Sequence, residues 1–242
     1  MGFWNSITSG IGNALSSIGS AVCSGISSIC SAIGGTFFSG AGGIAALAAS
    51  LIMPGLGLPE ILVGIGIISE IVSKIAESLG LKDKEETPEE LGMKAEISDK
   101  KPEDFDSIEN YIGYLRNDVQ IDKDKLERLS DEDKAKYAAV GTAINIKGIE
   151  EKYGIEATGE FWKTVAGLEL TGEETKQYIE SFKQNGITDM KDMSDYIRGF
   201  APESGTKPGV VSDAIMDALK KNNPGLTEDE LAEKFNSLSI SD

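Results

Sequence analysis

Large apolar residues recur at helical spacing through the first part of the chain. Over residues 3–33 they are separated by 4, 4, 3, 4, 4, 3 and 4 positions, close to the period of an α-helix. The spacing predicts a helix over residues 3–33 with one straight apolar stripe. The stripe consists of Ile7, Ile11, Leu15, Ile18, Val22, Ile26, Ile29 and Ile33.

A second row, made of small residues, follows a neighbouring face of the same predicted helix. Small residues every three or four positions let another helix or a lipid approach the backbone closely. We therefore expect this face to serve close packing. The row consists of Gly10, Ala14, Ser17, Ala21, Gly25, Ser28 and Ala32.

The third face of this helix carries serine, asparagine and threonine instead of charged residues, and the first charge in the chain is Glu60. Four glycines cost the helix roughly 3–4 kcal/mol against alanine, so it should form only against a partner surface. Its pattern resembles amphipathic lipid-packing sensors, which bind membranes by apolar insertion. Two partners remain open, a bilayer or a protein surface that includes copies of the same helix.

Residues 36–79 are predicted to form a hydrophobic helical hairpin. Residues 36–53 are uncharged and would measure about 27 Å as a helix, marginally enough to cross a bilayer. The tip is assigned to Pro54, Pro59 and Glu60, because two prolines flank a glycine-rich turn. The second arm, ending at Leu79, carries a further apolar stripe. That stripe consists of Ile61, Ile65, Ile68, Val72, Ile75 and Leu79.

The second arm can cross a bilayer only if charged residues enter with it. Its uncharged part, residues 61–69, would span about 14 Å, and Glu70 and Lys74 follow. The segment loosely resembles the hydrophobic hairpin of pore-forming colicins, which soluble helices shield until a membrane is met. The alternative is a hairpin that forms the centre of a soluble helical core.

From Lys82 onwards the chain becomes acidic and predicts helices. Residues 1–80 have a net charge of −2 out of −17 for the whole chain, so residues 81–242 carry −15. Residues 81–101 are predicted as a charged linker, with one short helix possible after Thr87, and residues 102–242 as an acidic helical domain. Helices should begin at Pro102, Ser130, Thr171, Asp189 and Thr227. The fold class is therefore all-α.

Composition excludes several functions. The acidic balance argues against binding to nucleic acid, which selects lysine and arginine. The chain has no histidine, which removes the commonest general base and metal ligand. Cys23 and Cys30 are expected to be small apolar fillers. The carboxylate pairs Glu150/Glu151 and Glu173/Glu174 are expected to cap helices or face solvent. No catalytic residue, cofactor or metal site is predicted.

These features together predict a non-enzymatic, membrane-active protein. In organisation the chain resembles injected effectors and pilot proteins of phage tails, contractile injection systems and type VI-like machines. That resemblance implies synthesis in the cytoplasm without a signal peptide, export by such a machine, and a lipid bilayer, delivery machine or chaperone as partner. The alternative is a structural protein whose first helix assembles with its copies, or with a partner, inside a tube, spike or groove.

Overall fold

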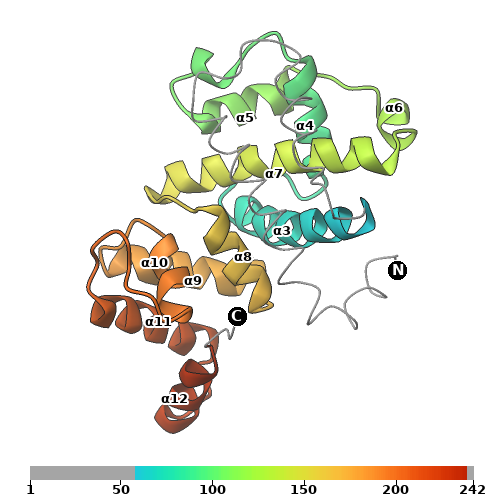
Figure 1. Ribbon diagram of the computed structural model, residues 1–242. Coiled ribbons are helices and arrows are strands. Elements are labelled where there is room, and N and C mark those ends of the chain that lie inside the picture. Colours follow the sequence, from blue (N-terminus) through green and yellow to red (C-terminus); the bar gives the residue numbers. More distant parts are fainter. Residues whose placement is uncertain (1–57, 239–242) are drawn as a thin grey trace.

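The computed structural model describes residues 58–238, and within that range the chain is helical, with no strand (Figure 1). The all-α class predicted from the sequence is confirmed for this part of the chain. The predicted helix 3–33, the first hairpin arm and Pro54 lie outside the described residues. The helices are α3 (Leu58–Ser78), α4 (Pro88–Ile97), the 3-10 helix η3 (Pro102–Asp104), α5 (Ile108–Asn117), α6 (Lys123–Glu127), α7 (Asp131–Tyr153), α8 (Gly159–Gly167), α9 (Gly172–Gln184), α10 (Lys191–Ile197), α11 (Pro208–Asn222) and α12 (Glu228–Ser237).

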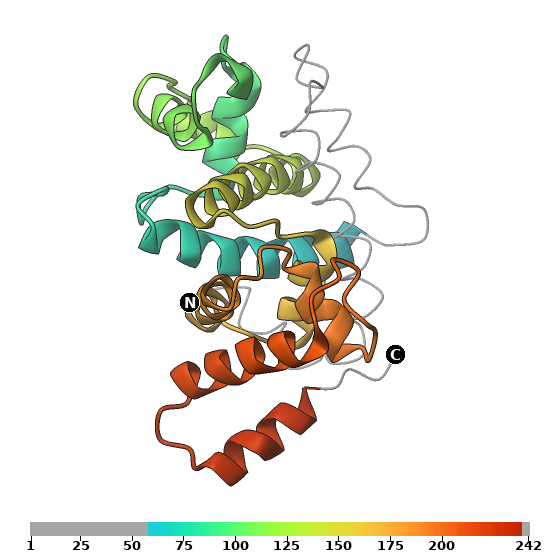
Figure 2. The same cartoon turned by 90° about the vertical axis from the view of Figure 1, so that its left-hand side faces the viewer.

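The helices stack in layers, with α3 in the central one. Figures 1 and 2 both place α3 between α7, which carries α4 and α5 on its far side, and the later helices α8 to α12. Helix α3 packs against α7 on one side and against α9 on the other, whereas the α3–α8 and α7–α9 contacts are both small. The two groups of helices are therefore joined mainly through α3.

The predicted apolar stripe of the second hairpin arm faces this core. Ile65, Ile68, Val72 and Ile75 are at most 2% exposed, while Glu70 lies on the solvent side. The arm is thus the central helix of a helical core, which both interpretations of the hairpin expect while it is shielded from a membrane. None of the helices between residues 58 and 238 is long and apolar enough to cross a membrane.

Residues 81–101, expected as a charged linker, also contribute to the core. The short helix expected after Thr87 is α4, and its buried residues pack on α7. The buried residues are Leu91, Gly92, Met93 and Ala95. Because two of the four are glycine and alanine, the sequence shows little apolar periodicity here although the helix is buried.

Three of the predicted helix starts are confirmed, together with the expected start after Thr87. Ser130, Thr171 and Thr227 each accept a hydrogen bond from the backbone N–H three residues on, and so does Thr87. At Thr87, Thr171 and Thr227 a glutamate reaches back to the cap backbone, which completes a capping box. These caps satisfy N–H groups that a helix leaves free at its start.

One predicted start is wrong, and the start predicted at Asp189 lies two residues before its helix, although the Asp189 carboxylate accepts a hydrogen bond from the Lys191 N–H. Pro102 opens only the short η3, and α5 begins after Ser107, whose hydroxyl accepts from the Asn110 N–H. Asp189 precedes the α10 cap, Met190, because residues 188–190 form a bridge with Glu156 before the helix begins. Capping residues are local sequence signals, so they could not predict where tertiary contacts shift the start of a helix.

Helices α4 and α7 cross at unusually short range, and two glycines allow it. A Cβ added at Gly141 would lie 1.9 Å from the Pro88 carbonyl oxygen, and one at Gly92 would lie 2.0 Å from that of Tyr137. Both contacts are with backbone, which cannot rotate away. The α4–α7 crossing therefore depends on the absence of side chains at these positions.

Replacing Gly141 with alanine should lower the free energy of unfolding by about 3 kcal/mol, because α4 must move away from α7. Gly113→Ala in α5 is the matched control, since nothing lies within 4 Å of its added Cβ. That change should stabilise the protein by about 0.5–1 kcal/mol through helix propensity. Urea unfolding measures both values, and equal effects would contradict the close crossing.

Candidate functional site

The residues predicted from the sequence to carry function fall mostly outside the described range. The stripe from Ile7 to Ile33 and the row of small residues lie there entirely. Pro59 and Glu60, expected at a hairpin tip, occupy the first turn of α3, and the arm that would complete the hairpin lies outside the described residues. Proline is tolerated in a first turn because its missing N–H has no helical partner there. The surroundings of α3 are therefore the part of the predicted site that can be described.

The interface between α3 and α7 contains one buried polar contact. The hydroxyl oxygens of Ser69 and Thr142 lie 2.6 Å apart, and both side chains are buried. A shift of either helix by one residue would separate the two hydroxyl groups and leave them unpaired, at a cost of roughly 1–3 kcal/mol for each group. This hydrogen bond therefore fixes the register of α3 in the core.

A groove opens between the other side of α3 and the connection from α8 to α9. Its volume is about 570 Å³, within the range of ligand pockets. We name it the α3–α9 groove. It is lined by Ile67, Glu70, Ile71, Lys74, Ala166, Glu169, Leu170, Thr171, Gly172 and Glu173.

One end of the α3–α9 groove is closed by direct contact between the start of α9 and α3. A Cβ added at Gly172 would lie 2.4 Å from the Lys74 Cβ and 2.8 Å from the Ile71 carbonyl oxygen. Glycine is therefore required for α9 to begin so close to α3. The groove's shape follows from this contact, because it sets the distance between its two walls.

The lining of the α3–α9 groove combines an apolar floor with a charged rim. Ile67 and Leu170 pack against the core while keeping part of their surface exposed. Glu70, Glu169 and Glu173 are exposed and form no ion pair with any described residue. The rim therefore carries three free carboxylates beside the single ammonium of Lys74, which pairs with Glu77 at 3.8 Å.

Glu169 has a backbone conformation that favours glycine. Its φ is +53°, and no other non-glycine residue between positions 58 and 238 has a positive φ. It ends α8 in a Schellman motif, since the Leu170 N–H donates to the Val165 carbonyl and the Glu169 N–H donates to that of Ala166, both at 3.1 Å. Glycine is the usual residue at this position, because a side chain there is strained.

Replacing Glu169 with glycine should therefore raise the free energy of unfolding by about 1 kcal/mol. The control is the reverse type of substitution, Gly154→Ala, at the end of α7. There φ is +65°, and an added Cβ meets no atom within 4 Å. That change should lower stability by about 1 kcal/mol for the same reason. If the melting temperatures of both variants shifted in the same direction, the result would contradict backbone strain at Glu169.

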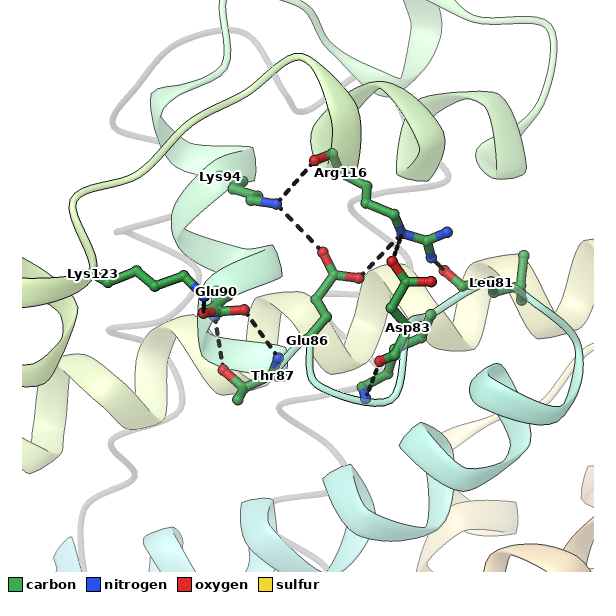
Figure 3. A network of polar contacts seen from close by, with 9 residues as sticks. Leu81, Asp83, Glu86, Thr87, Glu90, Lys94, Arg116 and Lys123 are labelled. Carbon is green, nitrogen blue, oxygen red and sulfur yellow. Dashed lines mark hydrogen bonds and ion pairs between the residues drawn. The ribbon is translucent and has the colours of Figure 1, made fainter.

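The loop that leaves α3 is held by a buried charge network, shown in Figure 3. The Glu86 carboxylate is 7% exposed and lies 3.5 Å from both the Lys94 Nζ and the Arg116 Nε. Neither contact has hydrogen-bond geometry, so both are ion pairs. Arg116 also donates to the Leu81 carbonyl, and Lys94 donates to the Arg116 carbonyl at 3.3 Å. The network ties the loop to α4 and α5 and so fixes the C-terminal end of α3.

Replacing Glu86 with glutamine should lower the free energy of unfolding by about 3 kcal/mol, because two partly buried cations lose their shared partner. The control is Glu85→Gln, at an exposed neighbouring position, which should change stability by less than about 0.5 kcal/mol. Chemical unfolding of both variants at neutral pH measures the difference. If the two variants lost similar amounts of stability, the charge network would contribute nothing to the free energy of unfolding.

Of the two carboxylate pairs singled out in the sequence, Glu150/Glu151 and Glu173/Glu174, all but Glu173 have structural partners. Glu174 completes the α9 capping box, while Glu150 accepts from the Ala157 N–H and Glu151 from the Ile108 N–H. Burial raises the pKa of Asp189, and the nearby Asp192 and Glu156 raise it further. In the described part of the chain no group of histidine, cysteine or acidic residues is arranged to hold a metal ion.

The comparisons with known protein families, curated proteins and solved structures found no match. The function must therefore be argued from this chain's own residues. Sequence reasoning had identified the apolar stripe of α3 but not the α3–α9 groove, whose two walls are about a hundred positions apart. The strain at Glu169 leaves no local signal, because glutamate is an ordinary helix former.

Proposed function

We propose that this is a non-enzymatic, membrane-active protein in which residues 1–57 contact the bilayer and the acidic helical domain stays folded as their carrier. The observation that supports this division is the burial of α3, which directly follows the neutral segment. The neutral residues are thereby attached to the central layer of the fold.

Helix α3 has little to gain from leaving the core for lipid. Its buried isoleucines are already out of water, so transfer to hydrocarbon would add little hydrophobic free energy. Glu70, Lys74 and Glu77 would enter with it, and a charged residue at the centre of a bilayer costs about 2.5–3.5 kcal/mol or more. We therefore limit the membrane-contacting part to residues before α3, which excludes the second arm of the predicted hairpin.

The acidic domain favours apolar over electrostatic contact with lipid. Residues 81–242 carry a net charge of −15, so an anionic membrane surface repels them. The neutral segment has no charge to be repelled, and its isoleucine stripe supplies apolar area. The resemblance in organisation to injected effectors extends the proposal to delivery by a phage-tail-like or secretion machine.

The two tryptophans of the chain report on the two parts separately. Trp4 lies in the neutral segment, whereas Trp162 is buried in α8, which packs against α3. Full-length protein and a Trp4→Phe variant should be mixed with vesicles that contain brominated lipid. We expect quenching of the Trp4 contribution, obtained by difference, and no change in Trp162 emission.

Charge placement provides the matched control for this test. Ile18→Asp with Ile29→Asp puts two charges on the stripe and should abolish vesicle binding and leakage. Ser20→Asp with Ser31→Asp adds the same charge to the opposite face of the predicted helix and should leave most binding. Quenching of Trp162 would show that α3 leaves the core, and failure of the full chain to bind vesicles at neutral or acid pH would refute the proposal. Loss of self-association instead of vesicle binding would favour the structural alternative.

A further inference from the structure

We propose that the α3–α9 groove docks a basic amphipathic helix from a partner protein. This proposal is independent of the membrane activity, because it concerns only folded residues of the described domain. The groove joins residues of α3 with the connection between α8 and α9.

Charge complementarity identifies the occupant. Glu70, Glu169 and Glu173 surround the groove without ion-pair partners among the described residues, and Lys74 is the one cation in the lining. The domain that carries the groove is itself strongly acidic. Lysine and arginine on the edges of an incoming helix would pair with these carboxylates. The negative electrostatic potential of the whole domain would also attract them to the groove.

The floor of the groove suits the apolar face of a helix. Ile67, Ile71 and Leu170 present aliphatic surface in the lining. From Ile67 to Lys74 the α3 wall covers two turns, about 10 Å, which matches two turns of a docked helix. Such helices insert apolar anchors at positions i, i+3 or i+4, and i+7 while their polar edges meet the rim.

Glu169 lines the groove in a left-handed backbone conformation. Glycine would fit the left-handed turn better, yet the chain has a glutamate there, and this glutamate lines the groove. Strained residues that a fold retains cluster at functional sites. A role for the carboxylate in binding accounts for a residue that the turn itself disfavours.

The same features argue against other occupants. Anionic lipid headgroups and acidic helices would be repelled by three free carboxylates. The chain's own helix over residues 3–33 has no cation to pair with the rim. A basic amphipathic helix is the occupant that matches both the floor and the rim.

The test titrates the full-length protein with a synthetic 18-residue helical peptide that carries leucine on one face and lysine on the other. Calorimetry at physiological salt should give one site with micromolar affinity, which weakens as salt increases. A leucine–glutamine peptide of the same length and a peptide of residues 3–33 should bind at least tenfold more weakly.

Variants locate the site and separate binding from folding. Glu70→Gln with Glu169→Gln should weaken binding about fivefold or more, whereas Glu228→Gln with Glu233→Gln, on exposed α12, should change it less than twofold. Glu169→Gly should weaken binding while the melting temperature rises, which a purely structural role of Glu169 does not predict. The proposal would be overturned if the α12 control variant lost as much affinity as the groove variant. It would also be overturned if the leucine–glutamine peptide or the peptide of residues 3–33 bound as tightly as the lysine peptide, or if the lysine peptide did not bind.

Discussion

The fold depends on the burial of α3 on two sides at once. At 100° per residue its buried positions cover an arc of about 160°, wide enough to meet α7 on one side and α9 on the other. The rest of its circumference carries Glu70 and Lys74, which are exposed. Because α7 and α9 barely touch each other, removal of α3 would separate the first group of helices from the second. The helix is therefore a structural requirement of the domain, although its apolar stripe had been assigned to a hydrophobic hairpin.

Close helix approach is the second constraint, and it links the core to the groove. Gly141 and Gly92 let α4 lie directly on α7, and Gly172 lets α9 start against α3. In each case backbone or Cβ atoms occupy the space where a side chain would otherwise stand. The glycines lower helix propensity by about 1 kcal/mol each, so tertiary packing must compensate for them. The groove exists beside one of these contacts because the α8–α9 connection has to turn sharply to reach it, and Glu169 adopts the left-handed conformation in that turn.

The parts of the fold predicted from the sequence were those with short-range causes. The stripe from Ile65 to Ile75 follows from periodicity, and the caps at Ser130, Thr171 and Thr227 follow from hydrogen bonds that span three residues. Burial of α4 could not be predicted in this way, because glycine and alanine pack through their backbone and leave no apolar pattern. The α3–α9 groove and the Glu86 network join residues far apart in the chain, so no local signal indicates them.

The place where the neutral segment joins the domain bears on how the two parts work together. Residues 1–57 lead directly into the helix that holds the two groups of helices together, and not into a peripheral element such as α12, of which only Leu231 is buried. Any tension on the segment would therefore act on a helix that packs against α7 on one side and α9 on the other. The Ser69–Thr142 contact resists a shift of α3 in register, and the Glu86 network fixes the loop at its far end. A domain attached in this way can stay folded while force acts on the segment before it, as the proposed function requires.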